Sequence, residues 1–357
     1  MSANDNKYYL RPFGFVPNSQ SSILLKNKSA IKVNGTVFTS IELIEKKKGK
    51  VRKKKYKVDI FLKSVAKKNK KIEILLKNAS EKQNFLNSNK FLKNKKFLIF
   101  SILNITPDSF SDGGDNFKLE DSLINAEQMI EEGADFIDIG GESTRPGADK
   151  VLPEDEVLRI LPIIQKLNNK KIKLSLDTRN SSTMELGLLS GVNIINDVSA
   201  LKNDSNSIEV VKKYKVPLVL MHMPGNPKTM MKINKYKNVV LDVYDFLEER
   251  INFCELNGIK KKNLIIDPGI GFGKNFEQNI EILNNLSIFH SLGCSIMLGI
   301  SRKRFISSIS KEDDPKMRLG GTISATILAM MQGVNIHRVH DVKQVNQALR
   351  VFEKLNS

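Results

Sequence analysis

A carboxylate, three glycines, an aromatic ring and a lysine follow one apolar run in the C-terminal half of the chain. The run covers residues 263–266, and residues 267–274 then read DPGIGFGK. The glycines let the backbone adopt left-handed dihedrals and approach a ligand closely. Asp267 would stand at the carboxyl end of a buried strand, where α/β enzymes place their chemistry. A tight strand-to-helix turn with a capping acid explains these residues equally well, and we expect Lys274 to lie in solvent at the following helix start.

The same alternation of an apolar run and a helical stretch recurs from residue 97 onward. Apolar runs without polar alternation predict strands covered on both faces, and eight such βα units close a parallel sheet into a barrel. The predicted fold class is therefore α/β, a (β/α)8 TIM barrel formed by residues 96–357. The predicted strands are residues 97–104, 136–140, 172–177, 192–197, 217–221, 263–267, 294–299 and 335–339, and the helices begin near Leu119, Pro153, Ser181, Ser205, Val239, Phe276, Arg318 and Val342.

Polar side chains stand at nearly every predicted strand end. Because these ends converge on one face of a barrel, residues scattered along the chain would form one site. Helix capping accounts for some of them, but not for Arg338 and His340 after the last strand. The strand-end residues are Asn104, Asp138, Asp177, Asn196, Met221, His222, Asp267, Gly299, Arg338 and His340.

Charge separates the N-terminal region from this body. Residues 1–100 hold 25 Lys and Arg against 6 Asp and Glu, whereas residues 101–357 hold 32 against 33. The net charge of +18 therefore belongs to a separate module, residues 1–95. Asn34-Gly35 predicts a hairpin, and polar–apolar alternation predicts further strands at residues 56–62 and 71–76. We expect a small β-rich domain preceding the barrel.

A basic run, residues 46–57, lies within this module and has nine Lys or Arg in twelve positions. One interpretation is a patch that binds nucleic acid or another polyanion through its phosphates. The other is a solvated hairpin whose lysines discourage edge-to-edge aggregation. The sequence favours the second, since no aromatic-rich RNA-binding or helix-turn-helix pattern supports binding.

The cysteines and the apolar runs indicate in which cellular compartment the protein is expected. Only Cys254 and Cys294 occur, far apart, which argues against a disulfide framework and a cysteine-based zinc site. No apolar run approaches the ~18 residues of a membrane span, and the polar start lacks the apolar segment of a signal peptide. We expect a cytoplasmic protein without membrane partners.

Eight ordered motifs resemble the dihydropteroate synthase family, the pterin-binding (β/α)8 enzymes of folate synthesis. Any one motif is weak evidence, but each follows the appropriate predicted strand, and together they cover the barrel from about residue 97 to 352. The motifs are LNITPDSFSDGG (103–114), DIGGESTRPGA (138–148), LDTR (176–179), INDVS (195–199), LMHMPGNPKTM (220–230), DPGIGFGK (267–274), GISRKRFI (299–306) and RVHDV (338–342).

The resemblance implies a transferase that joins 6-hydroxymethyl-7,8-dihydropterin pyrophosphate to p-aminobenzoate, giving 7,8-dihydropteroate and pyrophosphate. Carboxylates and amides suit the hydrogen-bond donors on the pterin edge, and Lys303 suits its carbonyl and ring nitrogen. Met221 would pack on the ring, although ordinary core is an equal explanation for it, and Arg338 would stack on the ring face. The implied pterin-binding residues are Asp177, Asn196, Met221, Asp267, Lys303 and Arg338.

The pyrophosphate leaving group requires anion donors, implied to be Asn104, Arg145, Arg338 and His340. Magnesium would assist its departure, with Asn104 as the protein ligand and pyrophosphate and water completing the shell. The aromatic amine then attacks the pterin methylene, and no protein nucleophile is required. The implied catalytic residues are Asn104, Asp177, Lys303, Arg338 and His340.

Two loops and an aromatic wall would complete the p-aminobenzoate side of the site. Residues 106–114 would close over the second substrate, as glycine-bearing loops do in barrels. Many family members have serine where this chain has Arg304, so the details of this pocket and its response to sulfonamide mimics are left open. The implied residues are Phe110, Asp112, Thr144, Arg145, Pro146, Gly271, Phe272 and Arg304.

Two other functions are compatible with parts of the pattern. A pterin-binding methyltransferase shares the fold and the acidic floor, but it handles no pyrophosphate and needs none of the arginine motifs. A nucleic-acid-binding protein with an inactive barrel would not need the intact polar strand ends. The family also dimerises through helices near the end of the barrel, and the apolar residues 322–331 would serve either a dimer interface or a helix buried on the barrel wall.

Overall fold

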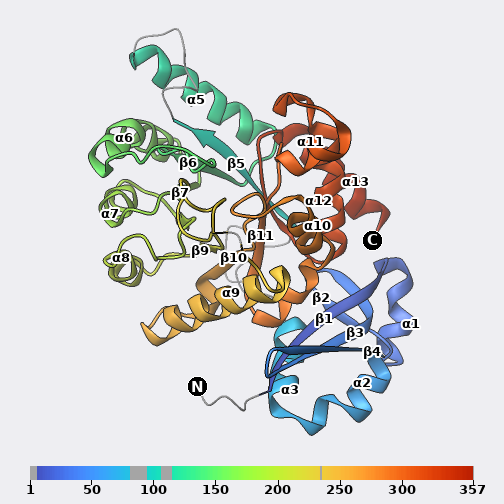
Figure 1. The fold of residues 1–357 in the computed structure, drawn as a ribbon. Coiled ribbons are helices and arrows are strands. Elements are labelled where there is room, and N and C mark those ends of the chain that lie inside the picture. The colour runs from blue at the N-terminus through green and yellow to red at the C-terminus, as the bar shows by residue number, and fades with distance from the viewer. Residues whose placement is uncertain (1–5, 81–94, 106–114, 234, 357) are drawn as a thin grey trace.

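The computed structural model describes residues 6–80, 95–105, 115–233 and 235–356. Within these ranges, eight parallel strands close a barrel in the order β10-β11-β12-β5-β6-β7-β8-β9, and helices surround it (Figure 1). The predicted (β/α)8 barrel is therefore confirmed. Its strands are β5 Leu98–Asn104, β6 Phe136–Gly140, β7 Leu174–Asp177, β8 Ile194–Asp197, β9 Leu218–Met221, β10 Leu264–Asp267, β11 Ser295–Gly299 and β12 Ile336–Val339.

The surrounding helices begin close to the predicted positions. One short helix, α11, was not predicted; it follows β11 directly and begins at Arg304. The helices are α5 Asp115–Glu131, α6 Pro153–Asn169, α7 Ser181–Leu189, α8 Ser207–Tyr214, α9 Val239–Leu256, α10 Phe276–Asn284, α11 Arg304–Ser310, α12 Leu319–Met331 and α13 Val342–Leu355.

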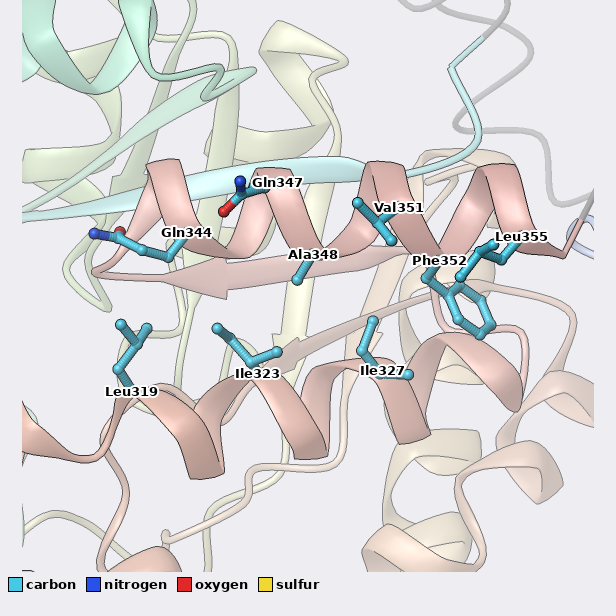
Figure 2. A pocket seen from close by; sticks show the side chains of 9 residues that line it. All are labelled: Leu319, Ile323, Ile327, Gln344, Gln347, Ala348, Val351, Phe352 and Leu355. Atoms are coloured by element: carbon cyan, nitrogen blue, oxygen red, sulfur yellow. The ribbon is translucent and has the colours of Figure 1, made fainter.

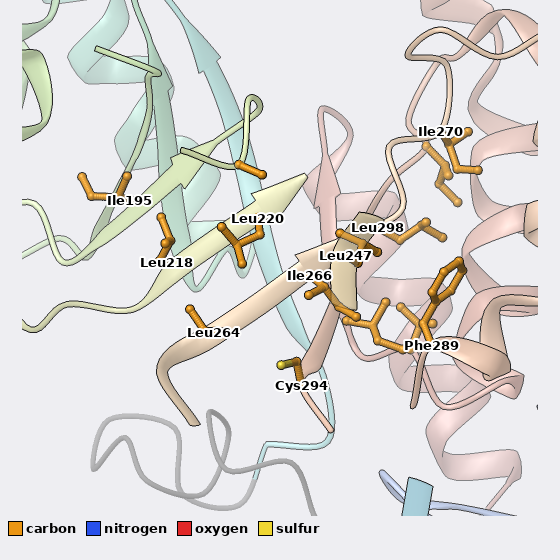
Figure 3. Close-up of a cluster of buried hydrophobic side chains, with 14 of the residues drawn as sticks. Ile195, Leu218, Leu220, Leu247, Leu264, Ile266, Ile270, Phe289, Cys294 and Leu298 are labelled. Atoms are coloured by element: carbon orange, nitrogen blue, oxygen red, sulfur yellow. The ribbon is translucent and has the colours of Figure 1, made fainter. Parts of the chain in front are cut away.

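Alternation along each strand separates two apolar layers. Ile265 of β10 packs inside the barrel with Phe100 and Met297. Its neighbours Leu264 and Ile266 point to the helices and belong to the large outer cluster (Figure 3). The apolar interior is a packed plug below the strand ends, so the polar residues that follow it open only toward the carboxyl face.

The N-terminal module contains an antiparallel sheet centred on β3 Thr36–Lys47. β3 pairs with β1 Lys7–Val16, β2 Ile31–Val33 and β4 Lys50–Lys57. The predicted hairpin at Asn34-Gly35 is confirmed, and Lys48-Gly49 makes a second two-residue hairpin. Both residues of each turn have positive φ, as a twisted two-residue hairpin requires.

Two strands predicted in the module are wrong. Residues 56–62 are the end of β4 followed by α2 Val58–Ser64, and residues 71–76 lie in α3 Lys70–Ser80. The residues of α3 that are buried against the sheet are Ile72, Leu76 and Ala79, at helical spacings of four and three. The window IEILL is too short to separate this spacing from alternation.

The module packs against the amino ends of barrel strands. Tyr9 of β1 lies edge-on to Tyr244 of α9, with ring centroids 5.0 Å apart, and its hydroxyl donates to Asp245 at 2.8 Å. The short helical segment η6, Leu286–Leu292, precedes β11, and the hydroxyl of Ser287 in it donates to the Pro12 carbonyl at 2.6 Å. The module thus lies away from the carboxyl face, in contact with helices of the barrel (Figure 1).

Candidate functional site

Three ionic side chains meet at the carboxyl end of the barrel interior. The Arg338 guanidinium of β12 donates to Asp138 of β6 at 2.6 Å and to Asp177 of β7 at 2.8 Å. The amide of Asn196 on β8 also donates to Asp138, at 3.1 Å. Asp138, Asn196 and Arg338 stand two residues after side chains of the apolar interior. Asp177 stands two residues after the buried Ser175, so strand alternation directs all four inward. Asp138 was noted as a strand end but was not assigned to the site, and its contacts place it in the same cluster.

Asp138, Asp177, Asn196 and Arg338 form the floor of the site. Two hydrogen-bond acceptors in this floor have no partner in the protein. Asp138 Oδ1 and Asp177 Oδ1 are buried and have no hydrogen-bond partner. Burial raises the pKa of Asp177 to about 7, and Arg338 opposes that shift. Burial acts to lower the pKa of Arg338, but Asp138 and Asp177 outweigh it and keep the guanidinium charged. Buried carboxylate oxygens without partners are costly, so they favour a ligand with several N–H donors.

Asp267 begins the glycine-rich loop after β10. Its Oδ1 accepts the backbone N–H of Gly269 at 2.7 Å, and burial raises its pKa. Gly269 has φ +69°, and a Cβ there would lie 2.0 Å from the His222 carbonyl oxygen. Only glycine fits that contact, which turns the chain sharply and brings the loop against β9.

Lys274 is buried, so its predicted exposure to solvent is wrong. Its Nζ donates to the carbonyl oxygens of Gly269 at 2.8 Å and Phe272 at 2.9 Å, and it lies 2.9 Å from His222 Nδ1. Burial lowers its pKa to about 7. The lysine thus ties the ends of β9 and β10 together through the loop. Its position was not predictable because the carbonyls that surround it come from a turn that forms only in the fold.

Lys303 and Phe272 form the opposite wall of the site. The Lys303 ammonium lies 4.2 Å from the Phe272 ring centroid. A Cβ at Gly271 would approach Lys303 Cδ to 3.1 Å, so the glycine leaves room for the lysine chain. Phe272 also packs on a cluster that contains Met221. An apolar wall and a cation therefore stand beside the carboxylate floor.

The charge of Lys303 depends on its neighbours. Burial and Arg338 lower its pKa to about 8, while Asp267 and Asp177 act in the opposite direction. Arg302, which precedes it, has φ +60° and makes a two-pronged ion pair with Asp341. This pair holds a strained backbone that turns Lys303 into the barrel. Arg302 and Asp341 were not predicted to be part of the site.

His340 follows β12 and faces the site as a neutral ring. Burial lowers its pKa to about 3. Ser301 Oγ accepts the His340 backbone N–H at 3.2 Å and lies 3.0 Å from Nδ1. A hydroxyl oxygen has two acceptor lone pairs as well as one proton, so Oγ can donate to Nδ1 or accept from it. The contact orients the ring, and its Nε2 is left for a ligand.

The remaining predicted residues lie at the rim or outside the described ranges. Asn104 is half-buried, and its Oδ1 is 3.7 Å from the position of a Cβ on Gly140. Thr144 is half-buried, whereas Arg145, Pro146 and Arg304 are exposed. Phe110 and Asp112 fall in residues 106–114, which lie outside the described residues.

Two buried networks support the loops of the site and were not predicted. Arg179 makes a two-pronged pair with Glu142, both contacts at 2.8 Å, joining the loops after β6 and β7. Glu156 accepts hydrogen bonds from Thr178, Asn180 and Thr183. Glu142 belongs to the motif DIGGEST, and Thr178 and Arg179 belong to LDTR. Part of each motif therefore supports the loops around the site.

The donor set limits which ions fit. In the part of the chain that the structure describes, no three His, Cys, Asp or Glu residues converge in a way that could hold a metal. The Asn104 amide oxygen, at the end of β5, is an oxygen donor that a magnesium ion could use together with ligands from a substrate. Among the same residues, no helix is long and apolar enough to cross a membrane.

Comparison with known proteins identifies relatives of the barrel. The family model described as pterin binding enzyme matches residues 100–340. Dihydropteroate synthase of Escherichia coli K12 is 41% identical over 256 residues, which cover 71% of this chain and 90% of the relative.

Solved structures give the same result. Xanthomonas albilineans dihydropteroate synthase with 4-aminobenzoic acid has a TM-score of 0.69 at 40% identity, covering 73% of this chain and 93% of that one. The same enzyme in complex with 7,8-dihydropteroate has a TM-score of 0.66 at 38% identity, covering 73% and 94%. The family model includes all the polar strand-end residues from Asn104 to His340, and it begins after the N-terminal module.

Proposed function

This chain belongs to the dihydropteroate synthase family of pterin-binding enzymes, and from that membership we propose how its own residues carry out the reaction. The protein condenses 6-hydroxymethyl-7,8-dihydropterin pyrophosphate with p-aminobenzoate to give 7,8-dihydropteroate and pyrophosphate. A carbon–oxygen bond to pyrophosphate breaks, a carbon–nitrogen bond forms, and the amine loses one proton. The observation that carries the assignment of residues is the pair of unpartnered carboxylate oxygens in the floor.

The floor binds the pterin edge. The amidine-like edge of a pterin presents adjacent N–H donors, and Asp177 Oδ1 and Asp138 Oδ1 are acceptors that need them. Asn196 extends the polar floor on the neighbouring strand β8, and Asp267 adds a carboxylate from β10. Lys303 supplies a donor to the ring carbonyl and nitrogen. Met221 packs against the ring.

Arg338 exchanges partners when the pterin binds. Its guanidinium now uses the Oδ2 atoms of Asp138 and Asp177. A pterin that donates to the free Oδ1 atoms shares the negative charge of these carboxylates with Arg338. The guanidinium then moves above the ring, stacks on its face and offers its donors to pyrophosphate. Its positive charge stays in the site throughout, because Asp138 and Asp177 favour the charged form and outweigh the effect of burial on its pKa.

The leaving group meets donors from four elements: Asn104, Arg145, Arg338 and His340. His340 donates from Nε2 in the tautomer whose Nδ1 accepts from the Ser301 hydroxyl, and that contact orients the ring. Negative charge that develops on the departing oxygen is stabilised by these donors, which are in place before the bond breaks. The catalytic set is therefore Asn104, Asp177, Lys303, Arg338 and His340, with no protein nucleophile.

Magnesium fits this arrangement as a cation held mainly by the substrate. Mg²⁺ keeps several waters and commonly takes one or two protein oxygens together with substrate phosphates, and the Asn104 amide oxygen is such a ligand. When bound, the ion neutralises charge on the leaving pyrophosphate. Asn104 stands at the end of β5, beside the floor, where it orients the pyrophosphate as well.

The p-aminobenzoate ring lies between the apolar wall and the rim. Phe272 and Gly271 form one side, and the loop with Thr144, Arg145 and Pro146 forms the other. Backbone hydrogen bonding from Gly147 to the Pro227 carbonyl, at 3.0 Å, ties that loop to the segment after β9. Arg304 is exposed at the start of α11 and is available to the substrate carboxylate, and Phe110 and Asp112 would close the pocket.

We propose that two copies associate through α12 and α13. In each copy a groove of about 510 Å³ lies between these two helices (Figure 2). Its lining is apolar except for Gln344 and Gln347. Val351 and Leu355 stand at one end of it and are 54% and 79% exposed. Val351→Glu should convert a dimer to monomers in light scattering, whereas Leu256→Glu, at an equally open position on α9, should not. Unchanged mass for Val351→Glu, or a monomeric parent protein, would contradict this proposal.

We also propose that residues 1–95 and 96–357 are separate folding units in a cytoplasmic protein. The module has its own apolar cluster around Phe38, Ile41 and Phe61, and both cysteines are free thiols. Deleting residues 1–95 should leave measurable turnover. A truncated chain that fails to fold would overturn the boundary.

The experiment that tests the reaction scheme uses purified protein with both substrates and Mg²⁺, and follows pyrophosphate release and dihydropteroate formation. The parent protein should turn over, and Asp177→Asn and Lys303→Ala should each lose pterin binding or turnover while retaining the far-ultraviolet circular dichroism of the fold. A folded Asp177→Asn variant with full activity would refute the role of the floor.

A further inference from the structure

The part of the chain with the highest density of positive charge lies outside everything that the relatives share. Matches to dihydropteroate synthases already cover 90–97% of several relatives but only 71–75% of this chain. The family model begins at residue 100. The sheet of the N-terminal module, and strand β4 in particular, is therefore additional to the synthase barrel.

Strand β4 exposes its cations to solvent. Lys50, Arg52, Lys53, Lys54, Lys55 and Lys57 are all exposed. None of the six makes an ion pair with a carboxylate among the residues that the structure describes. Neighbouring cations on the same face of a strand are about 7 Å apart and repel one another. β4 thus carries uncompensated charge.

The carboxylates that lie near β4 are already used. Glu42, opposite Lys55 in the ladder, pairs with Arg11 at 3.0 Å. Glu45, opposite Arg52, accepts from the Asn6 amide at 2.8 Å. On the barrel, Asp245 pairs with Lys7 and Lys46. The barrel neutralises the first cations of the sheet but not those of β4, so an intramolecular partner does not explain the strand.

Aromatic rings lie among these cations. Phe13 of β1 has Arg11 at 5.4 Å and Lys55 at 5.7 Å from its ring centroid, on the sheet face that carries Lys53. On the other face, Lys54 lies 5.2 Å from the Tyr56 ring. Both rings are partly exposed, and the Tyr56 ring also packs edge-on against Phe61, with ring centroids 5.5 Å apart. Cations interleaved with aromatic rings match the chemistry of single-stranded nucleic acid, which offers phosphates and stackable bases.

We propose that the outer edge of β4, together with the exposed part of the Phe13 ring beside Lys55, forms a binding surface for single-stranded nucleic acid. Within the described residues, β4 pairs only with β3, so its outer edge is free for a ligand. An anionic membrane is a poorer fit because Val51 is the one apolar residue that β4 exposes to insert among lipids. The module packs at the amino ends of the barrel strands, so a bound strand leaves the carboxyl face open and turnover unaffected.

Binding is measured by fluorescence anisotropy of labelled oligouridylate with the full-length protein, over a series of salt concentrations. The test variant changes Lys50, Lys53, Lys54 and Lys55 to Gln. The matched control changes four exposed barrel lysines, Lys260, Lys262, Lys316 and Lys343, to Gln, and so removes the same charge. A further variant, Phe13→Leu, keeps an apolar side chain and removes the ring.

The β4 variant should bind at least tenfold more weakly than the parent and reduce the slope of log K against log salt by about 3. The barrel control should stay within twofold of the parent, and Phe13→Leu should weaken binding about fivefold at high salt, where stacking dominates. Turnover should be unchanged in all three variants. Equal losses in the two quadruple variants, no binding by the parent, or tighter binding to phosphatidylserine vesicles than to oligouridylate would overturn the proposal.

Discussion

Charge has opposite surroundings in the barrel and in the N-terminal module. In the barrel, Arg338 forms ion pairs with both Asp138 and Asp177 at the carboxyl end of the packed apolar interior. In the module, the cations of β4 stand in water without carboxylate partners among the described residues. Buried charges require partners at defined positions, so their identity and geometry are restricted. Exposed charges are interchangeable, so the composition of β4 matters more than any one residue.

The two regions also differ in how they depend on each other. The barrel closes on itself, whereas one face of the module's sheet is completed by barrel side chains, with Tyr9 and Ile44 in the barrel's outer apolar cluster. The contact is at the opposite end from the site. Changes at the carboxyl face should therefore affect turnover, and changes at the module contact should affect stability.

The largest effect is expected at the floor. Asp177→Asn removes the charge that faces Arg338 and the pterin edge, and should lower kcat/KM by about a thousandfold or more, since interactions of this kind are worth several kcal/mol. Steady-state kinetics measure the loss. The control, Asp155→Asn at an exposed position on α6, should change kcat/KM less than twofold. Comparable activity in the two variants would remove the distinction between buried and exposed charge.

Tyr9→Ala tests the module contact. Tyr9 is buried, lies against Tyr244 and donates to Asp245, so its loss should reduce the free energy of unfolding by about 3–5 kcal/mol. The kcat should remain within twofold at temperatures where the variant is folded. Chemical denaturation measures the first quantity, and Tyr9→Phe should recover most of it. A lower kcat in folded Tyr9→Ala would instead reveal coupling between the module and the site.

Lys274→Met tests whether the buried lysine acts through the loop. Loss of its bonds to the Gly269 and Phe272 carbonyls should loosen the Phe272 wall, and kcat/KM for p-aminobenzoate should fall about 10- to 100-fold. The KM for the pterin substrate should change much less, because among the described residues Lys274 makes no hydrogen bond or ion pair with Asp138, Asp177 or Asn196. Kinetics with each substrate varied in turn measure this split, and equal effects on both substrates would assign the lysine a general structural role.

The smallest expected effect is on pH dependence. Burial and Arg338 lower the pKa of Lys303 to about 8 in the free enzyme, and in the proposed scheme its protonated form donates to the pterin. As pH rises through 8 the donor is lost, so kcat/KM for the pterin substrate should fall about tenfold per pH unit. Lys303→Arg should move this fall above pH 10. A fall at the same pH in Lys303→Arg would assign the titration to another group.

The barrel was predictable from the sequence because its signals are long or repeated. Most of the eight apolar runs end in polar residues, and their order with the intervening helical stretches restricts the topology to one closed sheet. The module was less predictable. Residues 71–76 form part of a helix whose buried face is visible only over the longer span Ile72–Ala79.

The sequence by itself determined which chemical groups stand at the strand ends, because strand alternation and parallel topology bring them to one face. Only the tertiary structure decided their partners. Lys274 is buried because carbonyls from a glycine turn and the His222 ring surround it, and Arg338 contacts Asp138, 200 residues away. Burial and pairing are properties of the closed barrel, and they depend on distances between segments that no local pattern contains.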